Sequence, residues 1–289
     1  MPMITERARA KVNLTLKILG RRSDGYHELE SLVAFADVGD VVTLDSDAPA
    51  GVWVTGTFGG SIAGENLVRV TLDLLAAAEP QLRLGAIVLD KRLPVAAGIG
   101  GGSADAAAVL RAVRRANPDL ADRVDWSGLA LKLGADVPVC FHNSAAIMRG
   151  IGEKLEPVDG LPPLCVILVN PQVPVPLDKT ARVFSMLGAK PLGALPSKNV
   201  QKSFETRTNL LKFMLETRND LTPPALTVVR DASKVWMKLG CLDEVEYIEI
   251  SGGGPTCFAV FPDDARAQAA AAQLQADFPD WWVVATAVS

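Results

Sequence analysis

Residues 94–116 read PVAAGIGGGSADAAAVLRAVRRA, and this stretch decides how the rest of the chain is interpreted. Four of the five positions 98–102 are glycine, directly before an alanine-rich run that favours a helix. Glycine permits backbone conformations in which successive N–H groups point at one spot. A helix that begins at Ser103 adds its own unpaired N–H groups and the positive end of its dipole. The segment therefore predicts an anion site, of the kind that holds phosphate groups, at the start of a helix.

The glycine pattern differs from the common nucleotide-binding motifs. A Walker loop needs a lysine, which residues 94–105 lack. A Rossmann loop, G-x-G-x-x-G, fails because Ser103 stands at its last position, and such a loop normally follows the first strand of its domain. The H-R-D triplet of protein kinases is absent. Two alternatives remain: another phosphate-binding family, or a glycine-rich turn without a ligand, which would lose chain entropy without a gain in packing.

The composition is that of an ordinary globular protein. Hydrophobic residues make up 49% and charged residues 21% of 289 residues, and the net charge is −4. This balance predicts no basic face for nucleic acid or for an anionic membrane. Because the sequence shows neither a long apolar run nor an apolar signal core, we expect a cytoplasmic protein. Four cysteines without a C-x-x-C pair, and only two histidines, predict buried free thiols and no zinc site.

Apolar periodicity predicts a mixed chain of the α+β class. Apolar and polar residues alternate over residues 8–18, which predicts one half-buried strand. Residues 226–239 have helical spacing, and the polar residues 190–203 predict a loop. Prolines and a glycine in residues 157–163 predict a domain boundary. A second glycine turn, SGGGP at 251–255, stands between two strand-like segments and could equally be a tight hairpin turn.

Three segments resemble the three motifs of the GHMP kinase superfamily, in that family's order. PVAAGIGGGSADAAAVL resembles the second motif, P-x-x-x-G-L-G-[GS]-S-[SA]-[SA], with Ile99 in place of its leucine. AKVNLTLKILGRRSDGYHELES at 10–31 resembles the first motif, and ISGGGPTCFAVF at 250–261 the third. The resemblance implies ATP as phosphate donor with Mg²⁺. It also implies a two-domain α+β fold, with a ribosomal-S5-like domain in 1–158 and a ferredoxin-like domain in 159–289.

Within this superfamily, the first motif resembles the branch that phosphorylates 4-diphosphocytidyl-2-C-methyl-D-erythritol. AKVNL followed by DGYHEL at 24–29 carries the likeness, and LGADVPVCF at 133–141 and Asn219-Asp220-Leu221 extend it. The resemblance implies transfer of the γ-phosphate of ATP to the C2 hydroxyl of this small-molecule substrate, in the non-mevalonate pathway to isoprenoid precursors. We expect a monomer or a weak homodimer without nucleic-acid or membrane partners.

Two charged residues are the candidates for catalysis, and both are also expected to contact the acceptor. Asp136 lies in a largely apolar segment, and phosphoryl transfer needs a group that accepts or orients the proton of the acceptor hydroxyl. From spacing alone, Asp136 could as well cap a short helix; the resemblance favours catalysis. Lys11, on the polar side of the first strand, would keep that carboxylate ionised and stabilise developing negative charge. A lysine there is otherwise a solvated one, so this role depends on the resemblance.

The acceptor pocket is also assigned by resemblance. Asn13 would hydrogen-bond the acceptor, and His27 would hydrogen-bond the cytosine edge. Tyr26 would stack on the cytosine, because a planar base binds well on an aromatic ring. Thr180 and Phe184 resemble the family's threonine and aromatic residue four positions apart, which implies a diphosphate contact and the opposing ring. Without the resemblance, Asn13 would be a surface amide and His27 a turn histidine packed on the surface.

The nucleotide site is expected at the glycine segment, with Lys91 reaching it from the preceding strand. The Ser103 hydroxyl could bind a phosphate or a phosphate-bound magnesium ion, and no acidic residue is marked as a metal ligand. Asp105, just inside the helix, is interpreted as structural. The residues that the segment contributes are Pro94, Val95, Ala96, Ala97, Gly98, Ile99, Gly100, Gly101, Gly102, Ser103 and Ala104.

Two other functions stay open. Another GHMP enzyme, such as a homoserine, mevalonate or sugar kinase, would keep the glycine loops without the cytosine pocket, and Gly25-Tyr26-His27 argues against it. A nucleotide-binding regulator without chemistry would not need Asp136 and Lys11.

Overall fold

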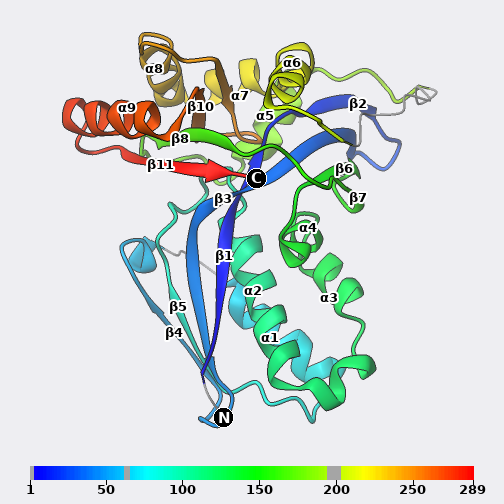
Figure 1. Ribbon diagram of the computed structural model, residues 1–289. Helices are drawn as coiled ribbons and strands as arrows, with labels where there is room; N and C mark the ends of the chain where they lie inside the picture. Colours follow the sequence, from blue (N-terminus) through cyan, green and yellow to red (C-terminus); the bar gives the residue numbers. More distant parts are fainter. Residues whose placement is uncertain (1–2, 62–65, 194–202) are drawn as a thin grey trace. The chain divides into compact units, whose positions relative to one another are not determined.

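The computed structural model describes residues 3–61, 66–193 and 203–289, which form two compact units (Figure 1). The first unit comprises the described residues of Met1–Lys11, Val38–Val95 and Gly100–Asn143, and the second those of Val12–Asp37, Ala96–Ile99 and Ser144–Ser289. Each unit is therefore assembled from several stretches of chain, unlike the successive segments 1–158 and 159–289, whose boundary stays a prediction about the sequence.

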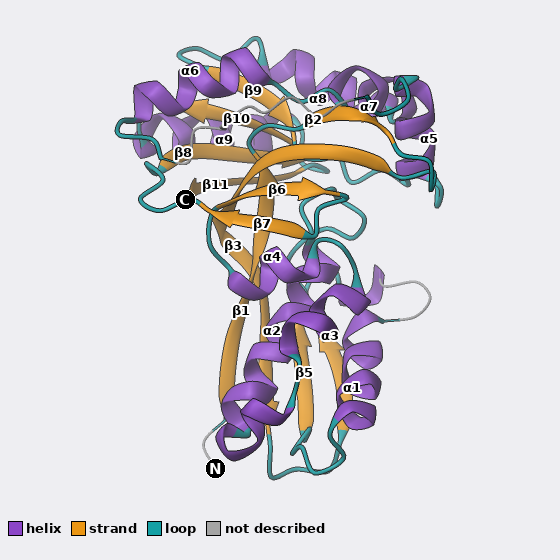
Figure 2. Ribbon diagram, turned by 90° about the vertical axis from the view of Figure 1, so that its right-hand side faces the viewer, coloured by secondary structure: helices purple, strands orange, loops and turns teal. Residues whose placement is uncertain are grey.

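The first unit is a sheet with helices packed on one side (Figure 2). β5 (Ala86–Asp90) pairs antiparallel with Val41–Asp45 of β3 (His27–Asp45) and parallel with β4 (Gly51–Thr55). The Asn66 and Asp125 side chains cap α1 and α3 by accepting backbone N–H bonds. The helices are α1 (Leu67–Ala78), α2 (Gly101–Ala116), α3 (Trp126–Leu133) and α4 (Val137–His142), with short 3₁₀ turns at Gly59–Ser61 and Pro118–Arg123.

The first strand differs from its prediction in two ways. β1 (Ile4–Asn13) ends at Asn13, so the predicted strand over 8–18 is interrupted before β2 (Lys17–Arg21). The polar residues Lys11, Asn13 and Thr15 are as buried as their apolar neighbours, at 4%, 4% and 1% exposed. The prediction of a half-buried strand with a solvated side is therefore wrong. Because buried polar groups need hydrogen-bond partners, these side chains must be paired within the protein.

The second unit is built on an antiparallel sheet in the order β11–β8–β10–β9. These strands, with helices after the first and third, follow the chain order 4-1-3-2 of a ferredoxin-like domain, as predicted. β6 (Ala146–Gly150) pairs with β3 and with β7 (Lys154–Pro157), and β2 also pairs with β3. The four central strands are β8 (Leu164–Asn170), β9 (Tyr247–Ile250), β10 (Cys257–Phe261) and β11 (Trp282–Val288).

The described residues of the second unit form five helices. Apolar residues of the last two, Val235, Leu239 and Leu274, pack with Val169 and Phe261 of the sheet in one core. The predicted helix over 226–239 is two helices, because Val229, with a φ of −116° and a ψ of 87°, leaves the helical conformation. The helices are α5 (Lys179–Leu187), α6 (Arg207–Thr217), α7 (Thr222–Val228), α8 (Arg230–Leu239) and α9 (Asp264–Asp277). Of the predicted loop 190–203, residues 194–202 lie outside the described residues.

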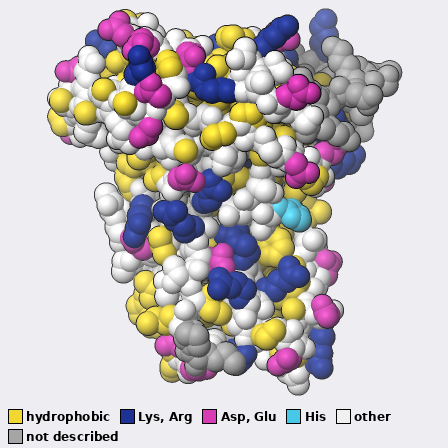
Figure 3. Space-filling model, in the orientation of Figure 1, with side chains coloured by type: hydrophobic (Ala, Val, Ile, Leu, Met, Phe, Trp, Pro, Cys, Tyr) yellow, Lys and Arg dark blue, Asp and Glu magenta, His cyan; other side chains and the backbone are white. Residues whose placement is uncertain are grey.

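The surface carries mixed charges. On the face that Figure 3 shows, basic and acidic side chains lie among hydrophobic ones. Among the helices that the structure describes, none is long and apolar enough to span a membrane. All four cysteines are free, as predicted, but only Cys140 and Cys257 are buried, whereas Cys165 is half-buried and Cys241 is exposed.

Candidate active site

The glycine segment leads into α2, which begins at Gly101 rather than at the predicted Ser103. Gly100 precedes it with a φ of +66°, and no side chain caps the helix. The first intrahelical bond is donated by the N–H of Ala104 to the Gly100 carbonyl, at 2.8 Å. The N–H groups of Gly101, Gly102 and Ser103 therefore have no partner within the helix, and this arrangement favours an anion.

Lys11 and Asp136 meet in the first unit. The Lys11 ammonium donates to Asp136 Oδ1 at 2.8 Å, and the two side chains are 5% and 39% exposed. Asp136 stands at the N-cap position of α4, yet its side chain makes no capping hydrogen bond. The carboxylate thus pairs with Lys11 and leaves part of its surface open, so it does not act as the simple cap that was the alternative. A Cβ at Gly100 would lie 3.2 Å from Lys11 Cβ, which brings the pair next to the start of α2.

Lys91 also lies beside the glycine segment, but two carboxylates hold its ammonium. It contacts Asp40 and is 2.7 Å from Asp105 Oδ2, and Lys91 is only 3% exposed. Burial lowers the pKa of Lys91, and the charges of Asp105 and Asp40 outweigh it, so that the pKa is raised. Burial raises the pKa of Asp105 to about 8, against the opposing charge of Lys91. A Cβ at Gly101 would lie 3.2 Å from the ammonium, so the Lys91 side chain packs directly against the first residue of α2.

A pocket of about 770 Å³ in the second unit gathers four of the predicted acceptor residues: Tyr26, His27, Thr180 and Phe184. Tyr26 lies in the turn before β3, His27 is the first residue of β3, and Thr180 and Phe184 come from α5. The rings of His27 and Phe184 are stacked, with centroids 4.7 Å apart and planes at 29°. Tyr26 is 60% exposed. Burial, and then the charge of Arg21, lower the pKa of His27, which favours a neutral imidazole.

Asn13 is the last residue of β1 and belongs to the second unit. Its Nδ2 donates to Ser31 Oγ at 2.8 Å, and its backbone N–H donates to Ser251 Oγ at 3.2 Å. The Ser251 hydroxyl donates to the Gly98 carbonyl at 3.0 Å. Asn13 Oδ1 lies 3.4 Å from where a Cβ of Gly252 would be. Asn13 is therefore a buried amide rather than a surface one.

The two glycine turns touch each other within this unit. Gly98 has a φ of +80°, and a Cβ there would lie 2.5 Å from the Gly254 carbonyl oxygen, so only glycine fits. The N–H of Thr256 donates to the Ala97 carbonyl at 3.1 Å. The SGGGP turn does join two antiparallel strands, β9 and β10, as a hairpin, and it also packs against residues 96–99.

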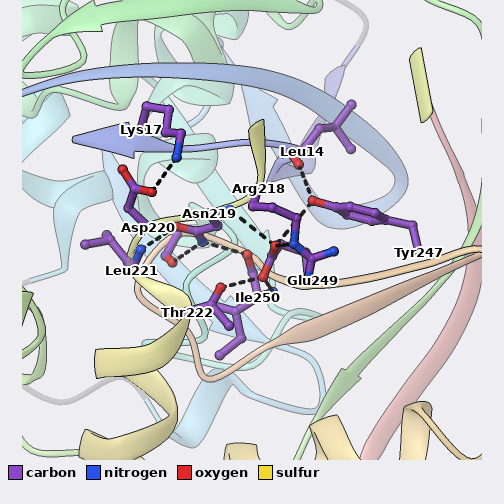
Figure 4. A network of polar contacts seen from close by, with 11 residues as sticks. Leu14, Lys17, Arg218, Asn219, Asp220, Leu221, Thr222, Tyr247, Glu249 and Ile250 are labelled. Atoms are coloured by element: carbon purple, nitrogen blue, oxygen red, sulfur yellow. Dashed lines mark hydrogen bonds and ion pairs between the residues drawn. The ribbon is translucent and has the colours of Figure 1, made fainter. Parts of the chain in front are cut away.

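A polar network supports the second glycine turn (Figure 4). Asn219 Nδ2 donates to the carbonyls of Ile250 and Gly252 at 2.9 and 2.8 Å. Asp220 accepts from the Lys17 ammonium at 2.7 Å and from the Ile18 N–H at 2.9 Å. The segment Asn219-Asp220, which precedes α7, therefore connects the second glycine turn to β2 by hydrogen bonds.

Two residues that the sequence analysis left out contact the glycine turns. Ser251 is fully buried and bridges Asn13 and Gly98. Lys179 is 8% exposed, and its ammonium donates to the carbonyls of Ala96 and Gly254. The first serine of SGGGP could have signalled Ser251, but nothing in the sequence around Lys179 distinguishes it from a solvated lysine at the start of a helix.

The fold and the glycine segments define a GHMP kinase. The family model of the GHMP kinases N terminal domain matches residues 66–144, and that of the GHMP kinases C terminal domain matches residues 237–280. The 4-diphosphocytidyl-2-C-methyl-D-erythritol kinase of Methylobacterium radiotolerans is 48% identical over 99% of this chain and 99% of its own. The enzyme of the same name from Rhodopseudomonas palustris is 44% identical over the whole of both chains. The chain therefore belongs to the family of 4-diphosphocytidyl-2-C-methyl-D-erythritol kinases.

Solved structures agree with this assignment. A crystal structure of 4-(cytidine 5'-diphospho)-2C-methyl-D-erythritol kinase matches with a TM-score of 0.75 and 29% identity, covering 99% of each chain. A homoserine kinase from Cytophaga hutchinsonii matches with a TM-score of 0.64 and 17% identity over 100% of this chain and 95% of its own, which shows the shared fold alone. The predicted α+β GHMP kinase fold is confirmed, and the chain is an enzyme, a kinase.

Proposed function

We propose that this kinase transfers the γ-phosphate of ATP to the C2 hydroxyl of 4-diphosphocytidyl-2-C-methyl-D-erythritol, a step of the non-mevalonate pathway to isoprenoid precursors. The observation that carries the proposal is the pocket shared by Tyr26, His27, Thr180 and Phe184. Two aromatic rings, an imidazole and a hydroxyl are what a cytidine diphosphate group needs for stacking, edge recognition and a phosphate contact. The names of the full-length relatives point to the same acceptor.

Asp136 is the proposed base. It accepts or orients the proton of the C2 hydroxyl while the oxygen attacks the γ-phosphorus, and the bond from that phosphorus to the bridging oxygen of ADP breaks. Lys11 holds the carboxylate at 2.8 Å and stabilises negative charge that develops nearby. Asn13, two positions further along β1, is the proposed contact for the acceptor's own hydroxyl groups.

ATP is the proposed donor because GHMP kinases are ATP-dependent, and the glycine segment is its proposed phosphate site. The free N–H groups at the start of α2 fit phosphate oxygens. Among the residues that the structure describes, no group of three or more His, Cys, Asp or Glu side chains is placed to hold a metal ion. We therefore propose that Mg²⁺ is held mainly by phosphate oxygens of ATP and by water, as this ion commonly is in kinases. The Ser103 hydroxyl is the proposed protein contact. Bound there, the ion would neutralise phosphate charge.

In the acceptor pocket, Tyr26 and Phe184 are the proposed stacking rings. His27 lies on Phe184, so the cytosine must either displace it or stack beside it, with the neutral imidazole bonding its edge. Thr180 is the proposed contact for the diphosphate.

ADP release tests the proposal directly. The purified chain, with ATP and Mg²⁺, should release ADP when given the diphosphocytidyl alcohol and should be inactive with homoserine or mevalonate. Turnover on either of the latter, with none on the diphosphocytidyl alcohol, would contradict the acceptor assignment and leave a GHMP kinase of another specificity.

A further inference from the structure

The first residue of α5, Lys179, is a buried lysine without an acidic partner. It is 8% exposed, and its Nζ donates to the carbonyl oxygens of Ala96, at 3.2 Å, and of Gly254. No carboxylate of residues 3–61, 66–193 or 203–289 forms an ion pair with it, whereas the other buried lysines, Lys11 and Lys91, each pair with aspartate. Its neighbour Asp178 pairs instead with Arg182 at 2.8 Å.

This uncompensated charge is costly unless an anion joins it. Lysine is almost never buried without a partner, because removing an ammonium from water costs several kcal/mol. Burial lowers the pKa of Lys179 to about 8, and no charged group offsets this effect. An ammonium has three N–H donors, and the two carbonyls use two of them. One N–H therefore remains available.

The position of the ammonium suggests the kind of anion. Ala96 belongs to the first glycine segment and Gly254 to the second glycine turn, and these two turns contact each other through Gly98. The first segment contains no lysine, unlike a Walker loop, where a lysine reaches the phosphates. Lys179 thus supplies, from a distant helix, a positive charge at the junction of both turns.

We propose that Lys179 is a phosphate-binding residue, which the two glycine-turn carbonyls hold so that its third N–H reaches a phosphate chain of the substrates. This inference rests on the proposed kinase function. The phosphate chain can be that of ATP, bound at the glycine segment, or the diphosphate of the acceptor, since Thr180, next in the chain, lines the acceptor pocket.

If Lys179 only links the two glycine turns, its replacement should lower the melting temperature without changing the affinity for either substrate. We would compare Lys179→Met, which removes the charge, with Lys179→Arg, which keeps it, and with Lys212→Met, a matched change at an exposed lysine of α6. The KM of each substrate and the melting temperature would be measured for all three. Lys179→Met should raise the KM of one substrate about tenfold or more, since a charged hydrogen bond is lost. Lys179→Arg should restore most of the affinity, and Lys212→Met should match the wild type.

The substrate whose KM rises identifies the phosphate source. A rise for ATP assigns Lys179 to the nucleotide, and a rise for the acceptor assigns it to the acceptor's diphosphate. If both KM values of a folded Lys179→Met stay within about twofold of the wild type, Lys179 is structural and the inference is wrong.

The pH dependence of binding offers a second test. Calorimetric affinities for ATP and for the diphosphocytidyl alcohol would be measured from about pH 7 to about pH 9.5, where phosphate groups with a second pKa of about 6 are almost fully ionised. Affinity for one of them should fall as Lys179 loses its proton near pH 8, and Lys179→Arg should not show this fall, whereas an effect of Asp105, which ionises in the same range, would persist in Lys179→Arg. Constant affinity for both would overturn the inference. Because these are binding measurements, they remain decisive even if the wild type shows no turnover, an outcome that would reject the proposed function instead.

Discussion

At the scale of single residues, the proposed phosphate transfer depends on the pairing of Lys11 with Asp136. A lysine and an aspartate that are 125 positions apart meet at 2.8 Å, and the lysine is nearly inaccessible to water. The carboxylate is only partly covered and is not used to cap α4. A side chain in this position is available to a substrate hydroxyl, which is what the proposed base requires.

Replacing Asp136 with alanine should therefore reduce kcat by about a hundredfold or more, the usual contribution of a general base. ATP affinity should stay close to that of the wild type, because the N–H groups of α2 are untouched. Steady-state kinetics with ATP titration would measure both quantities. Turnover within about tenfold of the wild type would show that Asp136 is not the base.

Replacing Tyr26 with alanine should raise the KM of the acceptor by about tenfold or more, since a stack on a base contributes roughly 1–3 kcal/mol. The KM of ATP should hardly change. Tyr26 is exposed, so the melting temperature should also stay the same. Equal changes in both KM values would argue against stacking on cytosine.

Because His27 is neutral at pH 7, the KM of the acceptor should depend on pH. The pKa of His27 is lowered from the ordinary 6.5, so the imidazole stays neutral at pH 7 and protonates only at lower pH. If the neutral ring bonds the cytosine edge, the acceptor's KM should be constant above pH 6.5 and rise as the pH falls below it. His27→Gln, which cannot be protonated there, should show no such rise. A KM of the wild type that is independent of pH would contradict this role.

At the scale of elements, the sequence predicts regular segments well and their environment less well. The apolar alternation over 8–18 and the helical spacing over 226–239 fall mainly on strands and helices of the structure, because such patterns are local signals. The same alternation, however, predicts solvated polar residues in β1, where the structure buries them. Their partners, Asp136 and Ser31, come from distant stretches that no local pattern indicates. The same limit explains why Lys179 was missed.

The candidate site was predicted in part. Sequence motifs indicated Tyr26, His27, Thr180 and Phe184, and the structure brings these four to one pocket. Lys91 was expected to reach the nucleotide from its strand, and its two carboxylate partners could not be foreseen from spacing.

The buried Asp105 carboxyl, near the start of α2, should make the stability of the fold depend on pH. Its pKa rises from 3.8 to about 8 on folding, so ionisation favours the unfolded chain, and this group's stabilisation is lost as the pH rises from about 4 to about 8. Asp105→Asn, which cannot ionise, should therefore gain stability relative to the wild type over this range. Urea unfolding at several pH values would measure the difference, with the exposed Asp277→Asn as control. A difference that does not change with pH would show that Asp105 does not titrate in this range.

At the scale of the whole molecule, one chain contains two glycine turns, a pocket with aromatic rings and a partly buried Lys–Asp pair, and its relatives match it over its full length. Homoserine kinase shares the fold at 17% identity, so the fold alone does not determine the acceptor. We propose that the pocket lined by Tyr26, His27 and Phe184 selects the acceptor in this chain.

The position of the transferred phosphate is the sharpest test of the proposed reaction. After reaction of the diphosphocytidyl alcohol with ATP, the phosphorus NMR spectrum of the product should contain one new phosphate monoester signal. Because C2 carries a methyl group and no hydrogen, this signal should show no splitting by a proton on the phosphorylated carbon. A doublet or a triplet would place the phosphate on the C3 or C1 hydroxyl, and the absence of any new signal would contradict the proposed reaction.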